Sequence, residues 1–235
     1  MNPVQLDNNT HRDLRIVTTR GAAWGDDQMT VPIFLSEFRT AQAYFPILFQ
    51  PADNGPGMQP VALLGLRAGE NLFLDAHGWN AGYLPLLLER GPFMIGRAGE
   101  QLMIHVDMDS PRIGRGEGEP AFLPHGATTD YLERVNTVLG EIHVGVETMP
   151  LFVAALLRHE LLESFVLDIA AAHGSQNRLA GFHTINEERL AALDAQAVAE
   201  LHKAGYLAPI YMVLASIAHL RDLIERYNKR FPKRD

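Results

Sequence analysis

The sequence contains no cysteine. This absence excludes disulfide bonds, thiolate metal sites and cysteine nucleophiles. Positive charge is also scarce, with 20 Lys and Arg against 28 Asp and Glu and a formal net charge of −8. Because phosphate contacts need a basic surface, nucleic acid is excluded as a general partner. The basic residues after Glu225 suit the C-terminal end of a helix.

Long apolar runs are missing as well. Charged or polar residues such as Glu89, Arg158 and His159 interrupt the most apolar segments. None of the runs reaches the roughly 18 apolar residues that can cross a bilayer, so no membrane span is expected. The first residues lack a basic region followed by an apolar region, so no secretory signal is expected and the predicted location is cytoplasmic.

Proline and glycine are distributed unevenly along the 235 residues. Of the 14 prolines, 11 lie at or before Pro124, and 15 of the 20 glycines lie within the first 126 residues. This punctuation favours short strands and turns in residues 12–125, whereas residues 126–230 read as mainly helical. With 47% hydrophobic residues, the chain is predicted to form a single α+β domain over residues 1–235. Its β-rich N-terminal part, an antiparallel or mixed sheet, is expected to pack with C-terminal helices.

Periodicity and turn residues predict the individual elements. Strands are expected at LRIVTT, PILFQ, PVALLGL, ENLFLDA and QLMIHVDM, and short helices at SEFRTAQAYF, capped by Ser36, and at NAGYLPLLLERGPF, ending at Arg90. In the second part, one helix is predicted to start at Thr129 and a second near Met149, with Pro150 in its first turn. FVLDI and LAGFHTI are favoured as a hairpin over a helical continuation, with its turn at HGSQN. Further expectations are a capping box from Thr184 to Glu187, a helix stop at Gly205 and a last helix from about Pro209.

A polar stretch, QLMIHVDMDSPRI, offers candidate metal ligands. His105, Asp107 and Asp109 alternate along an expected strand, so their side chains share one face. Imidazole and carboxylate are ordinary ligands of zinc and iron, and His-x-Asp supplies two of the three ligands of a non-haem iron triad. His183 is the candidate third ligand, with Arg189 as an anchor for an acidic cosubstrate. The more frequent alternative is a strand with a wet polar face that ends in an Asx-type turn.

The segment DAHGWNAGY is the candidate binding loop. His77, Trp79, Asn80 and Tyr83 lie in a loop before a helix, and loops on a rigid scaffold often carry binding residues. The alternative is a buried Trp79 that fixes the loop to the sheet. HELLE, residues 159–163, lacks the second histidine of a zinc-protease helix and reads as a surface pair. Phosphate-loop and nucleophile-elbow motifs are absent, so the sequence names no cofactor and leaves catalysis open.

Several segments together carry a family resemblance. VPIFLSEFRTAQAYFPILF, VALLGLRAGENLFLDAHGWNAGYLPLLLERGPFMI, HVDMDSPRI with GEGEPAF, and GFHTINEERLAALDAQAVAELHKAGYLAPIYMVLASIAHL occur in the order found in the bacterial SapC family. The chain resembles this family from about Arg12 to Leu220. The resemblance implies an accessory role around uptake or modification of a substrate, because many relatives are encoded beside TonB-dependent outer-membrane receptors and halogenase-like proteins. A basic, aromatic and proline-containing run of such relatives is replaced here by residues 89–92, Glu-Arg-Gly-Pro.

Two hypotheses follow. The favoured one is a soluble accessory or binding protein that works with a protein partner, through the loop around Trp79 and the HVDMD edge. The other is a metal-dependent enzyme that uses His105 and Asp107. The two differ in whether a third ligand, such as His183, lies within coordination distance of that pair.

Overall fold

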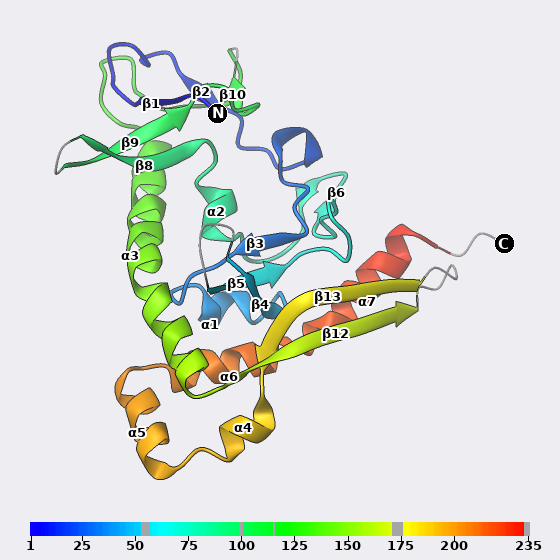
Figure 1. Cartoon of the computed structure of the whole chain (residues 1–235). Coiled ribbons are helices and arrows are strands. Elements are labelled where there is room, and N and C mark those ends of the chain that lie inside the picture. The colour runs from blue at the N-terminus through cyan, green and yellow to red at the C-terminus, as the bar shows by residue number, and fades with distance from the viewer. Residues whose placement is uncertain (53–56, 99–100, 115, 171–175, 233–235) are drawn as a thin grey trace. The chain divides into compact units, whose positions relative to one another are not determined.

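Antiparallel sheets dominate the N-terminal part of the chain and helices dominate the C-terminal part (Figure 1). The structure is a computed structural model that describes residues 1–52, 57–98, 101–114, 116–170 and 176–232. The α+β class predicted from the sequence is therefore confirmed. The contacts of the chain divide it into two compact units. Unit 1 comprises Met1–Asp26, Leu74–Trp79 and Leu86–Val144, and unit 2 comprises Asp27–Phe73, Asn80–Pro85 and Gly145–Asp235. A single-domain organisation stays a prediction.

The strands range from two to ten residues in length. They are β1 (Pro3–Gln5), β2 (Arg15–Ile16), β3 (Thr30–Pro32), β4 (Ile47–Pro51), β5 (Met58–Leu63), β6 (Leu74–Asp75), β7 (Gly78–Trp79), β8 (Phe93–Ala98), β9 (Gln101–Asp107), β10 (Ile113–Gly114), β11 (Glu119–Pro120), β12 (Leu162–Ala170) and β13 (Gln176–Ile185). Unit 1 has the sheets β1-β9-β8, β10-β2-β11 and β6-β7, and unit 2 has the sheet β12-β13-β4-β5-β3. Every strand pair described is antiparallel.

The helices range from single turns to 29 residues. They are the 3-10 helix η1 (Ala22–Trp24), α1 (Phe38–Ala41), α2 (Leu86–Glu89), α3 (Asp130–Arg158), α4 (Glu187–Ala191), α5 (Ala195–Lys203), α6 (Leu207–Ser216) and α7 (His219–Arg230). Most of the predicted elements exist. The strand expected at ENLFLDA is only the two-residue β6. Strand β8 was not predicted. The last predicted helix is divided into α6 and α7.

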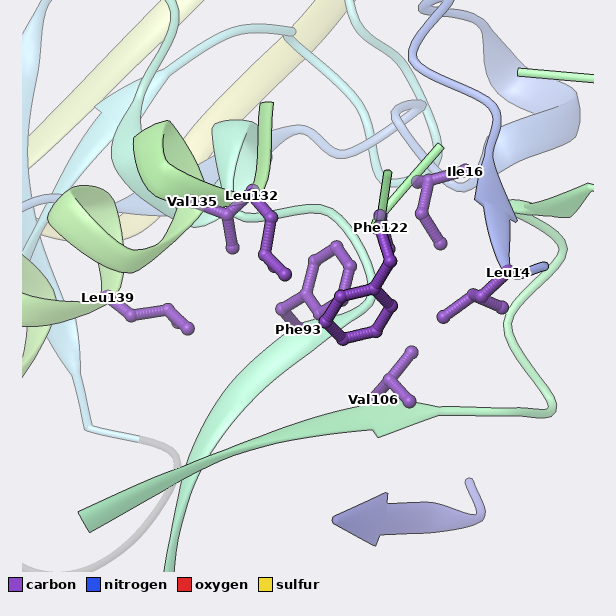
Figure 2. Packing of buried hydrophobic residues seen from close by; sticks show 9 residues of the cluster. Leu14, Ile16, Phe93, Val106, Phe122, Leu132, Val135 and Leu139 are labelled. Carbon is purple, nitrogen blue, oxygen red and sulfur yellow. The ribbon is translucent and has the colours of Figure 1, made fainter. Parts of the chain in front are cut away.

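The core of unit 1 lies between its sheets and the first half of α3 (Figure 2). Its buried members come from five separate stretches of sequence: Leu14, Ile16, Phe93, Val106, Ala121, Phe122, Leu132, Val135 and Leu139. Figure 2 shows the rings of Phe93 and Phe122 close together, with Leu132 and Val106 beside them. Val135 and Val138 of α3 are both buried, so this side of the helix is part of the packed interior.

An aromatic core holds unit 2 together. Phe38 of α1 meets Phe152 of α3 edge-on, with ring centroids 6.0 Å apart, and Phe152 meets Tyr206 at 5.2 Å. Ser216 of α6 is fully buried, and its Oγ accepts from the backbone N–H of Ile47 at 2.8 Å while it donates to the Val213 carbonyl at 2.6 Å. These bonds fix α6 against β4.

Helix α3 is continuous from Asp130 to Arg158, and the prediction of two helices is wrong (Figure 1). Thr129 caps its start as predicted, because its Oγ1 accepts from the N–H of Leu132 at 3.3 Å. Pro150 lies inside the helix and not at the start of a new one. Pro150 is exposed to solvent. The backbone hydrogen bond that proline cannot donate is therefore lost on the outer side of α3, and the helix continues.

The end of α3 is a Schellman motif. Glu160 has φ 55°, the N–H of Glu160 donates to the Leu157 carbonyl at 3.1 Å, and the N–H of Leu161 donates to the Leu156 carbonyl at 2.9 Å. Leu156 and Leu161 are both fully buried, which supplies the apolar contact typical of this motif. HELLE is therefore a turn and the start of β12, so His159 and Glu163 do not share a helical face.

The predicted hairpin of β12 and β13 is confirmed. Its register pairs Ser164 with His183 and Phe165 with Phe182. Residues 171–175, which contain most of the predicted HGSQN turn, lie outside the described residues. The Thr184 capping box is wrong, because the side chain of Asn186 caps α4 by accepting from the Arg189 N–H at 2.8 Å. Gly205 ends α5 as expected, with φ 76°.

Two segments are long and apolar enough to cross a membrane by length and composition, namely Asp130–Arg158 and Leu207–Arg230. The expectation of no membrane span is corrected by this finding. Pro150 does not interrupt α3, and a few charged residues within a long helix still leave it apolar enough on average to cross a membrane. Core helices of globular proteins can have the same length and composition, so these segments are weak evidence for a membrane.

A buried ion pair fixes the N-terminal segment of unit 1. Asp26 and Arg112 are 2% and 4% exposed, and Nη2 of Arg112 donates to both carboxylate oxygens at 2.6 Å. Nη1 of Arg112 donates to the carbonyls of Val17 and Thr19 at 2.9 and 3.0 Å. Arg20 lies 3.5 Å from Asp26, and its burial followed by the charge of Arg112 lowers the pKa of Arg20. One carboxylate thus lies against two largely buried guanidinium groups, and Arg112 makes the closer contact.

Candidate functional site

The predicted metal ligands His105 and Asp107 lie on β9, the central strand of its sheet. The intervening Val106 is fully buried, so the two polar side chains share the opposite face, as predicted. The imidazole of His105 lies against Gly96 of β8, where a Cβ atom would stand 2.3 Å from the ring. Its Nδ1 is 3.3 Å from the Met103 carbonyl. His105 therefore packs on the neighbouring strand.

Asp107 shapes the end of the strand. Its Oδ1 accepts from the N–H of Asn2 at 2.6 Å and from the N–H of Asp109 at 3.2 Å. The second bond is the Asx-type turn expected here, although Asp107 forms it and not Asp109. The carboxylate thus joins β1 to the turn after β9, in agreement with the interpretation of this stretch as a strand end.

His183, the predicted third ligand, belongs to unit 2. It pairs with Ser164 on β12 and with Phe49 on β4, and its Nδ1 is buried without a hydrogen bond to any described residue. Among the residues that the structure describes, no group of three or more His, Asp and Glu side chains could hold a metal ion. The metal-dependent enzyme is therefore not favoured.

The predicted binding loop is divided between the units. His77 and Trp79 belong to the β6-β7 hairpin of unit 1, while Asn80 and Tyr83 belong to unit 2. An Asx-type turn forms the hairpin tip, since Asp75 accepts from the His77 N–H at 2.7 Å. The hydroxyl of Tyr83 donates to Glu37 at 2.8 Å, a bond that anchors the loop. Binding by these four residues stays a prediction.

A groove in unit 1 is a further candidate, and its first wall is a turn at residues 7–12. Asp7 accepts from the N–H groups of Thr10 at 2.7 Å and Asn9 at 2.9 Å, and these bonds lower the pKa of Asp7. Nδ1 of the buried His11 accepts from the Asp7 N–H at 3.2 Å. The sequence DNNTH forms this turn because its short polar side chains bind nearby backbone groups.

The second wall is the turn Leu123–Gly126. Pro124 at its second position has a fixed φ suited to a turn, and Gly126 has φ 88°, which a residue with a Cβ rarely adopts. The N–H of Gly126 donates to the Leu123 carbonyl at 2.8 Å, and the N–H of Leu123 donates to the Ala127 carbonyl at 2.7 Å. These two bonds close the turn.

Side chains tie the two turns together. Nδ2 of Asn8 donates to the Gly126 carbonyl at 2.9 Å, and a guanidinium N–H of Arg12 donates to the Pro124 carbonyl. Two adjoining pockets of about 410 and 240 Å³ share Arg12. Together they form the Arg12 groove, lined by Asn8, Asn9, Arg12, Asp13, Arg15, Pro120, Phe122, Leu123, Pro124, His125 and Gly126.

Two guanidinium groups dominate the electrostatics of the Arg12 groove. Arg15 lies on β2 and donates to the Gly118 carbonyl at 2.9 Å. Within the described part of the chain, neither Arg12 nor Arg15 is paired with a carboxylate, and Asp13 is among the residues that line the same pocket. The groove can therefore hold a polar or anionic group at the arginines.

The sequence reading missed this groove. Its turn signals, DNNT and LPHG, are visible in the sequence, but Arg12 meets Pro124 across 112 residues. No local pattern predicts a contact over that separation. The sequence signal for the groove is the pair Arg12 and Arg15, which lie three residues apart on either side of the apolar Leu14.

Comparison with known proteins places the chain in one family. Neither a curated protein nor a solved structure matches it significantly. The family model named SapC matches residues 6–223 of the 235. Since this match covers most of the sequence, the chain belongs to the SapC family.

Proposed function

We propose that this SapC-family chain is an accessory or binding protein, and that the Arg12 groove of unit 1 is its ligand site. The observation that carries the proposal is the pair of adjoining pockets, of about 410 and 240 Å³, that share Arg12. Ligand sites in proteins are typically concave, about 300–1,000 Å³ in volume, and combine apolar walls with a few polar groups. The larger pocket falls within this volume range, and its lining combines apolar residues with Arg12 and Arg15.

The biological setting of the proposal comes from the family resemblance. That resemblance supports a role beside outer-membrane receptor uptake or substrate modification. We further propose a protein partner and a cytoplasmic location. Fractionation of the native host tests the location, and co-purification under mild conditions tests the partner.

A small-molecule screen tests the groove. A ligand present at about 100 times its Kd stabilises the folded state by about 2.7 kcal/mol, which thermal unfolding detects readily. The compounds that stabilise the wild type are then measured by calorimetry against Arg12→Gln. This change removes the charge but retains an N–H donor. Arg178→Gln is the matched control, because it removes the same charge from an exposed side chain of β13 in unit 2.

The proposal expects at least one compound whose binding is weakened about tenfold or more by Arg12→Gln, the loss of a charged hydrogen bond. Arg178→Gln should bind that compound like the wild type. If every stabilising compound binds Arg12→Gln and the wild type equally, or if none stabilises the wild type, the Arg12 groove is not the ligand site.

A further inference from the structure

We infer that the ligand of the Arg12 groove is a small amphipathic monocarboxylate, meaning one carboxylate attached to an apolar body. The inference rests on the proposed function and adds the chemical class of the ligand. It follows from three features of the groove: the two guanidinium groups, the apolar wall and the single carboxylate.

The guanidinium groups select an anion. Each offers five N–H donors in a planar fork that matches a carboxylate. Arg12 and Arg15 each donate to one backbone carbonyl, Pro124 and Gly118, which leaves donors directed elsewhere. Carboxylates outnumber cations in this chain, 28 to 20, and arginines elsewhere pair with them, as Arg134 does with Glu89 at 2.8 Å. Two neighbouring arginines paired only with carbonyls are therefore ready to accept an external carboxylate.

Part of the pocket wall is apolar. Pro120, Phe122, Leu123 and Pro124 line the same pocket as the two arginines. Phe122 is 8% exposed and belongs to the core of unit 1, so it forms a fixed floor, whereas Leu123 is 37% exposed. A ligand that covers this leucine removes its apolar surface from water, and this removal favours binding. A ring or short alkyl chain fits this wall better than a small inorganic anion does.

Asp13 limits the charge of the ligand. It lines the pocket beside Arg12 and Arg15 and has no cationic partner among the described residues. A second carboxylate or a phosphate dianion on the ligand would approach this negative charge, and like charges at close range disfavour binding. The Arg12 groove is thus suited to one negative charge.

Matched probes test the three features by calorimetry at low ionic strength. Phenylacetate carries the carboxylate and the ring, phenylacetamide is its neutral counterpart, phenylmalonate adds a second carboxylate, and acetate lacks the ring. Acetyl-glycyl-phenylalanine presents the same chemistry as the C-terminus of a peptide and so distinguishes a free acid from a peptide end. The proteins are the wild type, Arg15→Gln, Asp13→Asn, Leu123→Ser and the control Arg178→Gln. Far-UV circular dichroism confirms that each is folded.

Phenylacetate should bind the wild type about tenfold more tightly than phenylacetamide, because only the acid makes charged hydrogen bonds. It should also bind more tightly than acetate and phenylmalonate. Arg15→Gln should remove most of the preference for phenylacetate over phenylacetamide. Asp13→Asn should remove the preference for phenylacetate over phenylmalonate. Leu123→Ser should remove the preference for phenylacetate over acetate. Arg178→Gln should change none of the three.

Equal binding of phenylacetate and phenylacetamide would overturn the monocarboxylate assignment while the groove itself remained the binding site. Failure of every probe to bind the wild type at millimolar concentration would also overturn it. The screen described under the proposed function then shows separately whether the groove holds a ligand of another class.

Discussion

Removing the charge of Asp26 should destabilise unit 1 severely. Asp26→Asn keeps the size of the side chain but leaves Arg112 and Arg20, which are 5% and 13% exposed, without their carboxylate. The N–H of Gly21, which donates to Oδ2 at 2.9 Å, faces an amide in its place. Breaking a buried ion pair by removing one partner costs about 3–5 kcal/mol, because the remaining charge is buried without compensation. That is a large share of the 5–15 kcal/mol that typically separates folded from unfolded domains.

The matched control is Asp168→Asn. Asp168 pairs with Arg178 at 3.9 Å, but both side chains are highly exposed, at 76% and 68%. Exposed pairs contribute about 0–1 kcal/mol, so this variant should unfold almost like the wild type. A double variant, Asp26→Asn with Arg112→Met, should be less destabilised than the sum of its two single changes, since it removes both partners of the closest pair.

Urea unfolding followed by far-UV circular dichroism and by tryptophan fluorescence measures these differences, because Asp168 belongs to unit 2. The only two tryptophans, Trp24 and Trp79, both belong to unit 1, so their emission reports the unit that contains Asp26. An Asp26→Asn cost below about 1 kcal/mol, the range of an exposed pair, would refute the buried-charge reasoning.

Three further predictions concern the helix end, the sheet and the pH dependence. Glu160 has a left-handed backbone conformation, so Glu160→Gly should be more stable than Glu160→Ala by about 1 kcal/mol in urea unfolding. Both variants lose the ion pair with Arg189, but only glycine adopts the positive φ without strain. Equal stability of the two variants would contradict the Schellman assignment. Gly96→Ala should destabilise the protein by about 1–3 kcal/mol, because its Cβ would stand 2.3 Å from the His105 ring, and His105→Ala should recover much of that loss in the same assay. Burial raises the pKa of Tyr131 to about 12 from the usual value near 10, so its contribution to stability is complete below pH 10 and is lost as the pH rises to 12. Between pH 10 and pH 12 the free energy of unfolding of the wild type should fall by about 2 kcal/mol more than that of Tyr131→Phe. If the two proteins give parallel curves of unfolding free energy against pH, the pKa of Tyr131 is not raised.

Local patterns predicted much of the fold because they reflect interactions between neighbouring residues. The cap at Thr129, the stop at Gly205 and the strand Gln101–Asp107 each depend on a few adjacent residues. The hairpin of β12 and β13 was predictable because two β-prone segments flank a turn-rich centre. In each case the adjacent residues favour one local conformation over the alternatives.

The errors occurred where two local signals competed. Pro150 can start a helix or lie within one, and its exposed position in α3 allows the helix to continue. Thr184 and Asn186 can both cap a helix, and β13 extends to Ile185, so Asn186 is the residue at the helix start. His159 could continue α3, but the left-handed Glu160 ends it, and no glycine marks the place. The burial of Leu156 and Leu161 decides this case, and burial is a tertiary property.

The candidate site was missed for a stronger reason. His105 and Asp107 stand out in the sequence because histidine and aspartate are typical ligands, yet the structure engages both with the backbone and packing of their own sheet. Arg12 and Arg15 belong to no comparable motif. They line a pocket only because the turn that contains Pro124, more than a hundred residues later, lies beside them. A ligand site built from two turns depends on a contact that neither turn encodes. A chain with Pro124 and Gly126 replaced by alanine would keep every charged residue of the Arg12 groove, yet it should bind phenylacetate more weakly, since the second wall would lose its fixed turn. Unchanged binding would show that the arginines alone, and not the paired turns, form the site.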